Sequence, residues 1–371
     1  MNVRLNYILN YFLVCTFSAF GNDASISSSN TGSSPKIVKI EKQVDLQNEF
    51  VKSKIKFEDK SLDCKVIDET SLDESALNER DLVISQLWEE FPELSHAWQK
   101  WQSMHVVIKD WSKSKQQQLG IRVSDTILYP FGGGDVVFPI SFFPDFKELV
   151  IVGLEPVGKA VSFKARSGIA ANLAYLFSHG NFVTRDMEKF AKSGVSTVIY
   201  IQIKRLGAKK IRCIISNSMV EFDFILNGIS RKIVYIKMNL DDKHFVTWAC
   251  LFEKYKDYTL FMKSASFVPQ QPGFNKIKMS LMSGAHVILQ DDTGISYNDL
   301  RENGYYIDLC GAYYLRYTIV GLEHFFQEDL KEAYDEVKPA LLPFAIGYRS
   351  ESVPSNIMWA YKFDSPKIEA N

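Results

Sequence analysis

Two pairs of apolar segments, each pair joined through one helical segment, constrain the fold of this chain more than any other feature. In the first pair VSDTILYPF reaches a glycine turn and ELVIVGLEP follows; in the second, TLFMKSASFV (259–268) precedes AHVILQDDTG (285–294). Continuous apolar strands separated by a helix are typical of a parallel sheet covered on both faces. We therefore predict an α/β fold with a Rossmann-like, mostly parallel sheet, whose strand–helix–strand units span 123–158 and 259–294.

An N-terminal helical segment precedes the first unit. Apolar residues recur at three- and four-residue spacing from Leu72 to Gln118, and Gly120 follows as a stop signal. Three tryptophans in this segment have the spacing of a packing seam, which we favour over a binding face: Trp98, Trp101 and Trp111. We expect the segment, residues 71–120, to pack on the main domain.

A run of shorter strand candidates lies between the two units. Short turns separate them, which predicts a β-rich antiparallel insert at about 195–240. The four candidates are Ser196–Ile203, Lys210–Ser216, Val220–Asn227 and Ser230–Met238. Toward the C-terminus we expect a helix over 321–337 and strands over 341–348 and 357–363.

The first residues are typical of a secretory signal peptide. Arg4 precedes an apolar stretch, no acidic residue occurs before Asp23, and Ala19 and Gly21 fit a signal-peptidase site. We expect residues 1–21 to be a signal peptide, with a retained anchor, lipidation at Cys15 or a cytoplasmic chain as alternatives. The mature chain would then be exported, periplasmic or extracellular, and without an integral membrane segment.

Composition narrows the classes of partner. The net charge is −1, with 43 basic and 44 acidic residues, so no global field favours nucleic acid. A small molecule, a glycan or a protein are the partners that stay open. Residues 22–70 form a Ser-rich, then irregular, leader before the helical segment, and 121–371 form the main domain. The four cysteines after the signal fit either disulfides or buried thiols: Cys64, Cys213, Cys250 and Cys310.

The glycine turn after the first strand is a candidate ligand site. Gly132 and Gly133 would let a ligand approach the backbone, and Glu155 stands 23 residues after Gly132, where an acidic side chain can meet ribose hydroxyls. Asp135 could cap the next helix or meet a ligand cation. However, the turn is not a G-x-G-x-x-G motif, and two prolines, Pro139 and Pro144, interrupt the helix that would hold a phosphate. A nucleotide pocket, another ligand site and a purely structural turn all remain open.

A second acidic strand end lies in the second unit. Asp291 and Asp292 follow the strand directly and could bind a divalent cation or act as a general base, so we take them as candidate catalytic residues. A turn whose carboxylates accept backbone N–H groups is the alternative. Tyr348 and Arg349 are further candidate ligand-binding residues near a strand end. In a parallel sheet, Asp135, Glu155, Asp291 and Asp292 would all lie at the carboxyl edge.

Several longer motifs carry a resemblance to a known group of proteins. They are Y-P-F-G-G…D, F-F-P-D, V-G-L-E-P-V-G, K-S-A-S-F, I-L-Q-D-D-T-G-I-S-Y and L-P-F-A-I-G-Y-R. Together they resemble an uncharacterised family of exported bacterial proteins and lipoproteins, over roughly residues 80 to 360. The resemblance implies an exported protein and no known activity. The family often has Pro where this chain has Gly134, so a G-x-G cofactor signature is not part of the shared pattern.

Three functions from different classes follow as hypotheses. The first is binding of a ligand or partner at the acidic carboxyl edge of the sheet. The second is a divergent, methyltransferase-like enzyme in which Glu155 holds a ribose. The third is a metal-assisted hydrolase that uses Asp291 and Asp292. Neither a cofactor nor a resident metal is identified by the sequence.

Overall fold

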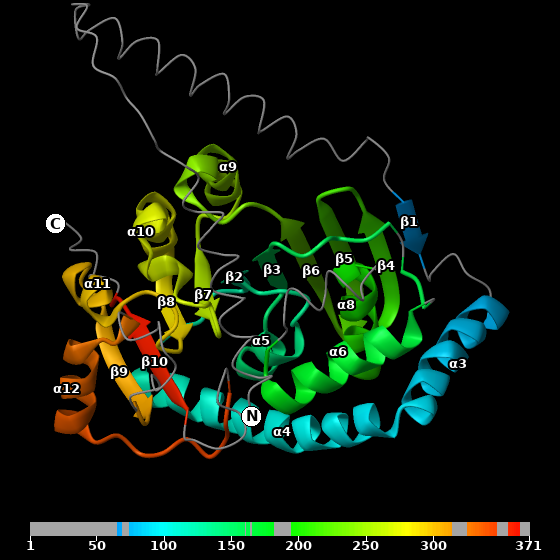
Figure 1. Ribbon diagram of the computed structural model, residues 1–371, viewed down its shortest axis with the longest axis horizontal. Coiled ribbons are helices and arrows are strands. Elements are labelled where there is room, and N and C mark those ends of the chain that lie inside the picture. Colours follow the sequence, from blue (N-terminus) through cyan, green and yellow to red (C-terminus); the bar gives the residue numbers. More distant parts are fainter. Residues whose placement is uncertain are drawn as a thin grey trace, which may run out of the picture.

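A single mixed β-sheet forms the centre of the protein in the computed structural model. The structure describes residues 65–68, 74–159, 161–163, 165–181, 194–313, 325–346 and 355–363. Within them the strand order is β1-β4-β5-β6-β3-β2-β7-β8-β10-β9. Helices cover both sides of this sheet (Figure 1), which confirms the predicted α/β class.

The five central strands run parallel. They are β6 (Ile229–Lys237), β3 (Glu148–Gly153), β2 (Thr126–Pro130), β7 (Tyr258–Met262) and β8 (Ala285–Gln290). Both predicted strand–helix–strand units are confirmed. Helix α5 (Val137–Phe142) joins β2 to β3, and helix α10 (Asn275–Gly284) lies between β7 and β8. Helix α5 is only six residues long, as expected with Pro139 inside it.

Antiparallel strands flank the parallel centre on both sides. Strands β4 (Lys209–Ile215) and β5 (Met219–Leu226) continue outward from β6, and β1 (Lys65–Asp68) pairs with β4. On the other side β10 (Asn356–Tyr361) lies antiparallel between β8 and β9 (Tyr306–Gly311). The predicted antiparallel insert is therefore part of the main sheet, because β6 pairs with both β5 and β3.

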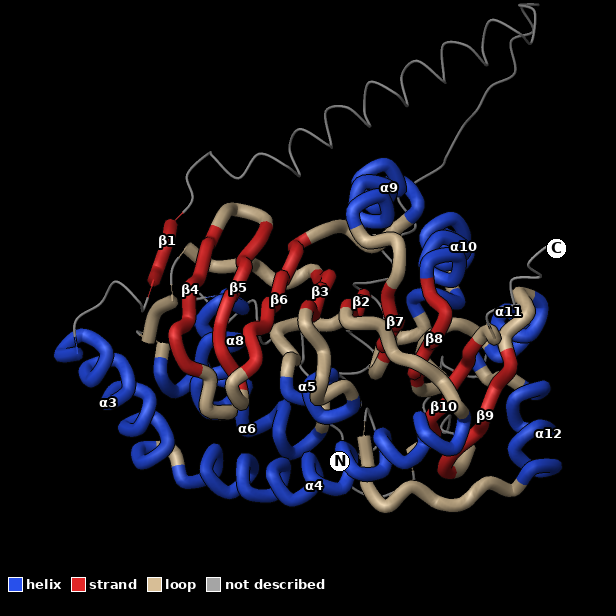
Figure 2. Tube along the Cα trace, turned by 180° about the vertical axis from the view of Figure 1, so that it is seen from behind, coloured by secondary structure: helices blue, strands red, loops and turns tan. Residues whose placement is uncertain are grey.

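Helices form a layer on each face of the sheet (Figure 2). One layer contains α3 (Glu74–Glu90), α4 (Pro92–Leu119), α5, α6 (Arg166–His179) and α8 (Gly194–Arg205). The other contains α9 (Phe245–Lys254), α10 and α11 (Tyr297–Glu302), with α12 (Glu328–Val337) beside β9 and β10. Three short 3-10 turns connect these elements: η2 (Asp242–His244), η3 (Val268–Gln270) and η4 (Pro272–Phe274). No helix in the described part of the chain is long and apolar enough to cross a bilayer.

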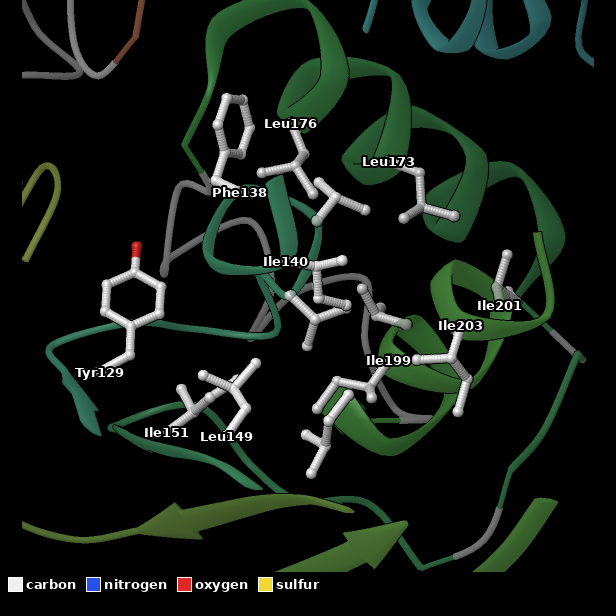
Figure 3. Packing of buried hydrophobic residues seen from close by; sticks show 14 of the residues in the cluster. Tyr129, Phe138, Ile140, Leu149, Ile151, Leu173, Leu176, Ile199, Ile201 and Ile203 are labelled. Carbon is white, nitrogen blue, oxygen red and sulfur yellow. The ribbon is translucent and has the colours of Figure 1, made fainter. Parts of the chain in front are cut away.

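Alternate residues of the central strands supply two apolar cores. Leu149 and Ile151 of β3 face the α4–α8 layer, whereas Val150 and Val152 face the α9–α10 layer. In the first core, side chains from β3, α5 and α8 point into one cluster (Figure 3). Trp98 and Trp101 are buried in the same core, in agreement with the predicted packing seam.

Two secondary-structure predictions are wrong. Residues Ser196–Ile203 belong to helix α8, although β-branched residues are frequent there. All of its residues from Gly194 to Ile203 are buried, and a buried run rich in β-branched residues cannot be told from a strand by its periodicity. The expected strand over 341–348 is absent from its described residues, 341–346. Helices α6, α9 and α11 and strand β9 were not predicted.

Candidate functional site

The five parallel strands end at one edge of the sheet, here called the carboxyl edge. Helix α5, after β2, packs on one face, and helix α9, before β7, packs on the other. The winding direction of the chain therefore changes between β2 and β7. Open α/β sheets bind their ligands at such a point, beyond the carboxyl ends of the strands. The residues directly after the five strands are Phe131, Leu154, Met238, Lys263 and Asp291.

The glycine turn after β2 is held closely against its neighbours. A Cβ atom at Gly132 would lie 2.6 Å from the ring of Tyr129, and one at Gly133 would lie 3.1 Å from Oε1 of Glu155. At Gly134 the nearest side-chain atom would be 3.4 Å away, an ordinary contact. The buried Gln202 amide of α8 donates to the Gly134 carbonyl at 2.6 Å. The turn thus needs a glycine at 132 and tolerates a side chain at 134.

Glu155 lies against this turn, as its position after β3 predicts. It is only 5% exposed, and Tyr235 of β6 donates from its hydroxyl to the Glu155 carbonyl at 2.9 Å and to Oε2 at 3.1 Å. Burial and the neighbouring carboxylate raise the pKa of Tyr235 well above its usual value, so the phenol stays protonated and donates. A Cβ at Gly153 would collide with Oε2 of Glu155 and with the Gly132 carbonyl, at 2.6 and 2.7 Å. Glycines therefore leave the space that this carboxylate occupies.

A buried ion pair joins the loop after β2 to the end of β7. Lys263 Nζ lies 2.9 Å from Asp135 Oδ2, and both residues are 2% exposed. The same ammonium group donates to the Gly180 carbonyl at the end of α6 and lies 4.5 Å from the ring centre of Phe138. Tyr129 donates weakly to Asp135 Oδ2, at 3.4 Å. The pair thus connects three loops at the point where the winding direction changes.

Burial dominates the electrostatics of this pair. Loss of hydration raises the pKa of Asp135, and the adjacent Lys263 opposes that rise only in part. A fully buried ion pair is costly to desolvate, so it contributes little to stability by itself. Because such a pair is costly and lies at the carboxyl edge of the sheet, it is a candidate for function.

Asp291 has a structural environment. Its carboxylate accepts the N–H of Ser264 at 2.9 Å and the N–H of Thr293 at 3.0 Å, and the Thr293 hydroxyl donates to it as well. Thr293 Oγ1 in turn accepts the N–H of Ala265 at 2.7 Å. The turn after β8 therefore holds the loop after β7 in place. For Asp291 this is the arrangement named above as the alternative to catalysis, in which the carboxylate accepts backbone N–H groups.

Asp292 is also held mainly through its backbone. Its N–H donates to Asn356 Oδ1 at 2.9 Å, and its carbonyl accepts from Gln270 and Gln327 at 3.0 and 3.2 Å. Within the described ranges, no group of three or more His, Cys, Asp or Glu side chains is arranged to hold a metal ion. A catalytic role for Asp291 and Asp292 stays a prediction.

Left-handed backbone conformations concentrate at this edge. Phe131 has a φ of 63°, and three residues of the loop after β7 also have positive φ angles: Ser264, Ser266 and Phe267, at 55°, 53° and 58°. Such conformations cost free energy in non-glycine residues and persist only where surrounding contacts impose them. The contacts from Asp291 and Thr293 do so for the loop after β7.

A hydrogen-bonded histidine after β6 was missed by the sequence analysis. His244 Nδ1 lies 2.5 Å from Asp241 Oδ1, and its Nε2 lies 2.9 Å from Asn239 Nδ2. The N–H of Met238 donates to the Gly153 carbonyl, which places this segment beside the end of β3. The spacing Asn-x-Asp-x-x-His was the only signal available, and it is too common to identify a site.

The sequence predicted that four acidic residues lie at one edge of the sheet: Asp135, Glu155, Asp291 and Asp292. In the structure they follow the carboxyl ends of β2, β3 and β8, which lie at that edge. Sequence reasoning had no means of pairing Asp135 with Lys263, because about half of the main domain separates them in the sequence. Tyr348 and Arg349 lie outside the described residues, as do the expected signal peptide and Cys64. Cys213, Cys250 and Cys310 are buried.

Comparisons with known proteins yield no relative: no family model, no curated protein and no solved structure matches this chain.

Proposed function

We propose that the carboxyl edge binds a small ligand that carries a vicinal diol, with the ribose of a nucleoside as the leading example. The observation that supports the proposal is the setting of Glu155. The Glu155 carboxylate lies in close contact with Gly133 and Gly153, which have no side chains. The Tyr235 hydroxyl donates to this carboxylate and orients it. An acidic side chain at the end of the strand next to a glycine turn is the arrangement that holds ribose hydroxyls in Rossmann-like sheets.

The strand order favours a nucleoside over a free sugar. Numbered in chain order, the five parallel strands read 3-2-1-4-5, which is the order of doubly wound dinucleotide-binding sheets. We therefore propose a Rossmann-like ancestry for the parallel centre. The absence of a G-x-G-x-x-G motif is consistent with a nucleoside-sized ligand, because a diphosphate would need free N–H groups at the start of a long helix, and α5 has six residues.

The test is a calorimetric titration of the full chain with adenosine and with 2′,3′-dideoxyadenosine. We expect adenosine to bind and the dideoxy compound to bind at least about tenfold more weakly, since the dideoxy compound lacks the two hydroxyl groups that would donate to the Glu155 carboxylate. Glu155→Gln should remove this discrimination, while Tyr235→Phe, the control at the same contact, should weaken it without abolishing it. Equal affinity for both compounds in the unaltered protein rejects the proposal.

A methyltransferase-like enzyme is the second candidate, and one observation favours it. Strand β10 runs antiparallel between β8 and β9, which gives the full order 3-2-1-4-5-7-6. This arrangement is similar to that of S-adenosylmethionine-dependent methyltransferases. The candidate predicts that S-adenosylhomocysteine binds more tightly than adenosine in the same titration.

We further propose that the chain is exported, on the basis of the signal-like N-terminus. N-terminal sequencing of the protein from an extracytoplasmic fraction should give a mature chain that starts near Asn22. Recovery of the intact Met1 terminus from the cytoplasm alone would contradict export and would favour the methyltransferase-like candidate, whose methyl donor is a cytoplasmic metabolite.

A further inference from the structure

Helix α8 carries a buried side-chain amide that holds the glycine turn. Gln202 is 0% exposed, and its Nε2 donates to the Gly134 carbonyl at 2.6 Å and to the Val198 carbonyl at 3.1 Å. Its Oε1 accepts the N–H of Val136 at 3.3 Å. Two carbonyl partners for the nitrogen and one N–H partner for the oxygen fix the orientation of the amide. Two of these three contacts go to the loop after β2, so Gln202 ties that loop to α8.

The first turn of the same helix holds the segment that carries Glu155. The N–H of Val195 donates to the Pro156 carbonyl at 3.0 Å. The N–H of Ser196 donates to the Val157 carbonyl at 3.1 Å. Pro156 and Val157 directly follow Glu155 in the chain. Because the first N–H groups of a helix have no partner within the helix, these contacts satisfy α8 and fix the segment at the same time.

Both sides of the Glu155 carboxylate therefore depend on one helix. Gly133, where a Cβ would lie 3.1 Å from Glu155 Oε1, directly precedes the residue whose carbonyl Gln202 holds. On the other side, Glu155 directly precedes Pro156, which the start of α8 holds. The helix is buried from Gly194 to Ile203, and a close-packed interior gives a firm support. The separation between the glycine turn and the carboxylate is thus set through α8.

We propose that Gln202 is a positioning residue for the diol site: through its contacts to the glycine turn it sets where that turn stands relative to the Glu155 carboxylate. This inference rests on the proposed function and assigns part of its selectivity to a residue that does not touch the ligand. Two hydroxyl groups of fixed spacing meet one carboxylate only where the surrounding groups are held to within about 0.5 Å. Packing alone would be served as well by Met at this position, which has a similar volume and no hydrogen bonds.

The experiment compares the affinities for adenosine and 2′,3′-dideoxyadenosine by calorimetry on the full chain. The proteins are the unaltered chain, Gln202→Met and the matched control Thr197→Val. Thr197 is also fully buried in α8, but its Oγ1 accepts the N–H of Ser162, at 3.0 Å, and not a group of the glycine turn. We expect the preference for adenosine to fall from at least about tenfold to less than about threefold in Gln202→Met and to persist in Thr197→Val. Both variants should unfold at lower urea concentrations than the unaltered protein.

A conservative variant adds a readout that packing alone would not change. In Gln202→Glu the protonated carboxyl group keeps one donor for the Gly134 carbonyl and one acceptor for the Val136 N–H, whereas the ionised form has no donor. We expect its preference for adenosine, relative to that of the unaltered protein at the same pH, to be retained at low pH. The preference should be lost as the pH rises and the introduced group ionises. Burial moves this loss to a higher pH than for an exposed Glu.

The outcomes separate this inference from the proposed function. A folded Gln202→Met that keeps the full preference overturns the positioning role and leaves the diol proposal intact. An equal loss of preference in Thr197→Val also overturns it, since the effect would then follow the stability of α8. If Gln202→Met does not fold, Gln202→Glu decides, and a preference that does not change with pH overturns the role. If the unaltered protein does not distinguish the two nucleosides, the proposed function fails and this inference fails with it.

Discussion

Asp135 and Asp291 are two buried aspartates at the same edge of one sheet, and their surroundings differ in kind. Asp291 is surrounded by N–H and O–H donors from its own turn and from the adjacent loop, so its charge is used to fix backbone. Asp135 instead faces the side-chain cation of Lys263, and the Phe138 backbone and the Tyr129 hydroxyl make further contacts with its carboxylate. Residue type and strand position therefore do not distinguish a carboxylate that fixes the backbone from one that belongs to a buried ion pair. The origin of the donors does.

The largest effect should come from removing one member of the buried pair. Lys263→Met leaves the Asp135 charge buried and uncompensated, and we expect the free energy of unfolding in urea to fall by about 3–5 kcal/mol. The double variant Asp135→Leu/Lys263→Met should return to within about 1 kcal/mol of the unaltered protein or exceed it. If the double variant is as unstable as the single one, the pair is a structural requirement and the contrast with Asp291 disappears.

The complementary change is Asp291→Ala. It removes the acceptor for the N–H groups of Ser264 and Thr293, and we expect a loss of about 2 kcal/mol in urea unfolding. Adenosine affinity should change by less than about threefold, since the carboxylate holds backbone and not ligand. A variant that stays folded and loses ligand binding would show that Asp291 belongs to the site after all.

Two glycines of the turn after β2, Gly132 and Gly134, allow a comparison with a smaller expected difference. Gly132→Ala brings a Cβ within 2.6 Å of the Tyr129 ring, and we expect a loss of about 1–2 kcal/mol, as for other overpacked positions. Gly134→Ala meets only ordinary contacts and should lie within about 0.5 kcal/mol of the unaltered protein. Thermal unfolding of the two variants in parallel measures the difference. Equal losses would show that the turn is sensitive to any side chain, irrespective of the Tyr129 contact.

The smallest signal is a pH dependence. The pKa of Asp135 is raised above 3.8 in the folded protein, so over the window above that pH the folded chain binds more protons than the unfolded chain. Its contribution to the free energy of unfolding therefore falls as the pH rises through this window. Urea unfolding at a series of pH values above 3.8 should show this slope in the unaltered protein relative to Asp135→Leu/Lys263→Met. The opposite slope would mean that Lys263 dominates and lowers the pKa.

The local sequence pattern was sufficient to predict the parallel strands at the centre of the sheet. It was not sufficient to predict all the helices and strands around them. The apolar strands around Gly132 and Asp291 carry a strong signal, because strands buried on both faces are continuous apolar runs. Helix α8 gave the same signal for a different reason: it is buried on every side, so Ser196–Ile203 reads as a strand. At the site, Glu155 was predictable from its distance to the glycines. The partner of Asp135 was not, since the pairing with Lys263 depends on how β2 and β7 meet.

The adjacency of β2 and β7 also has a consequence for the order of folding. Ile127 pairs with Thr259, so the centre of the sheet closes only after the antiparallel strands β4 to β6 have been synthesised. Contacts between such distant residues are formed slowly, because a long loop must be closed first. Strands β4, β5 and β6 pair between neighbours in the chain and can form early as a local hairpin array. We therefore expect the pairing of β2 with β7 to form after this hairpin array.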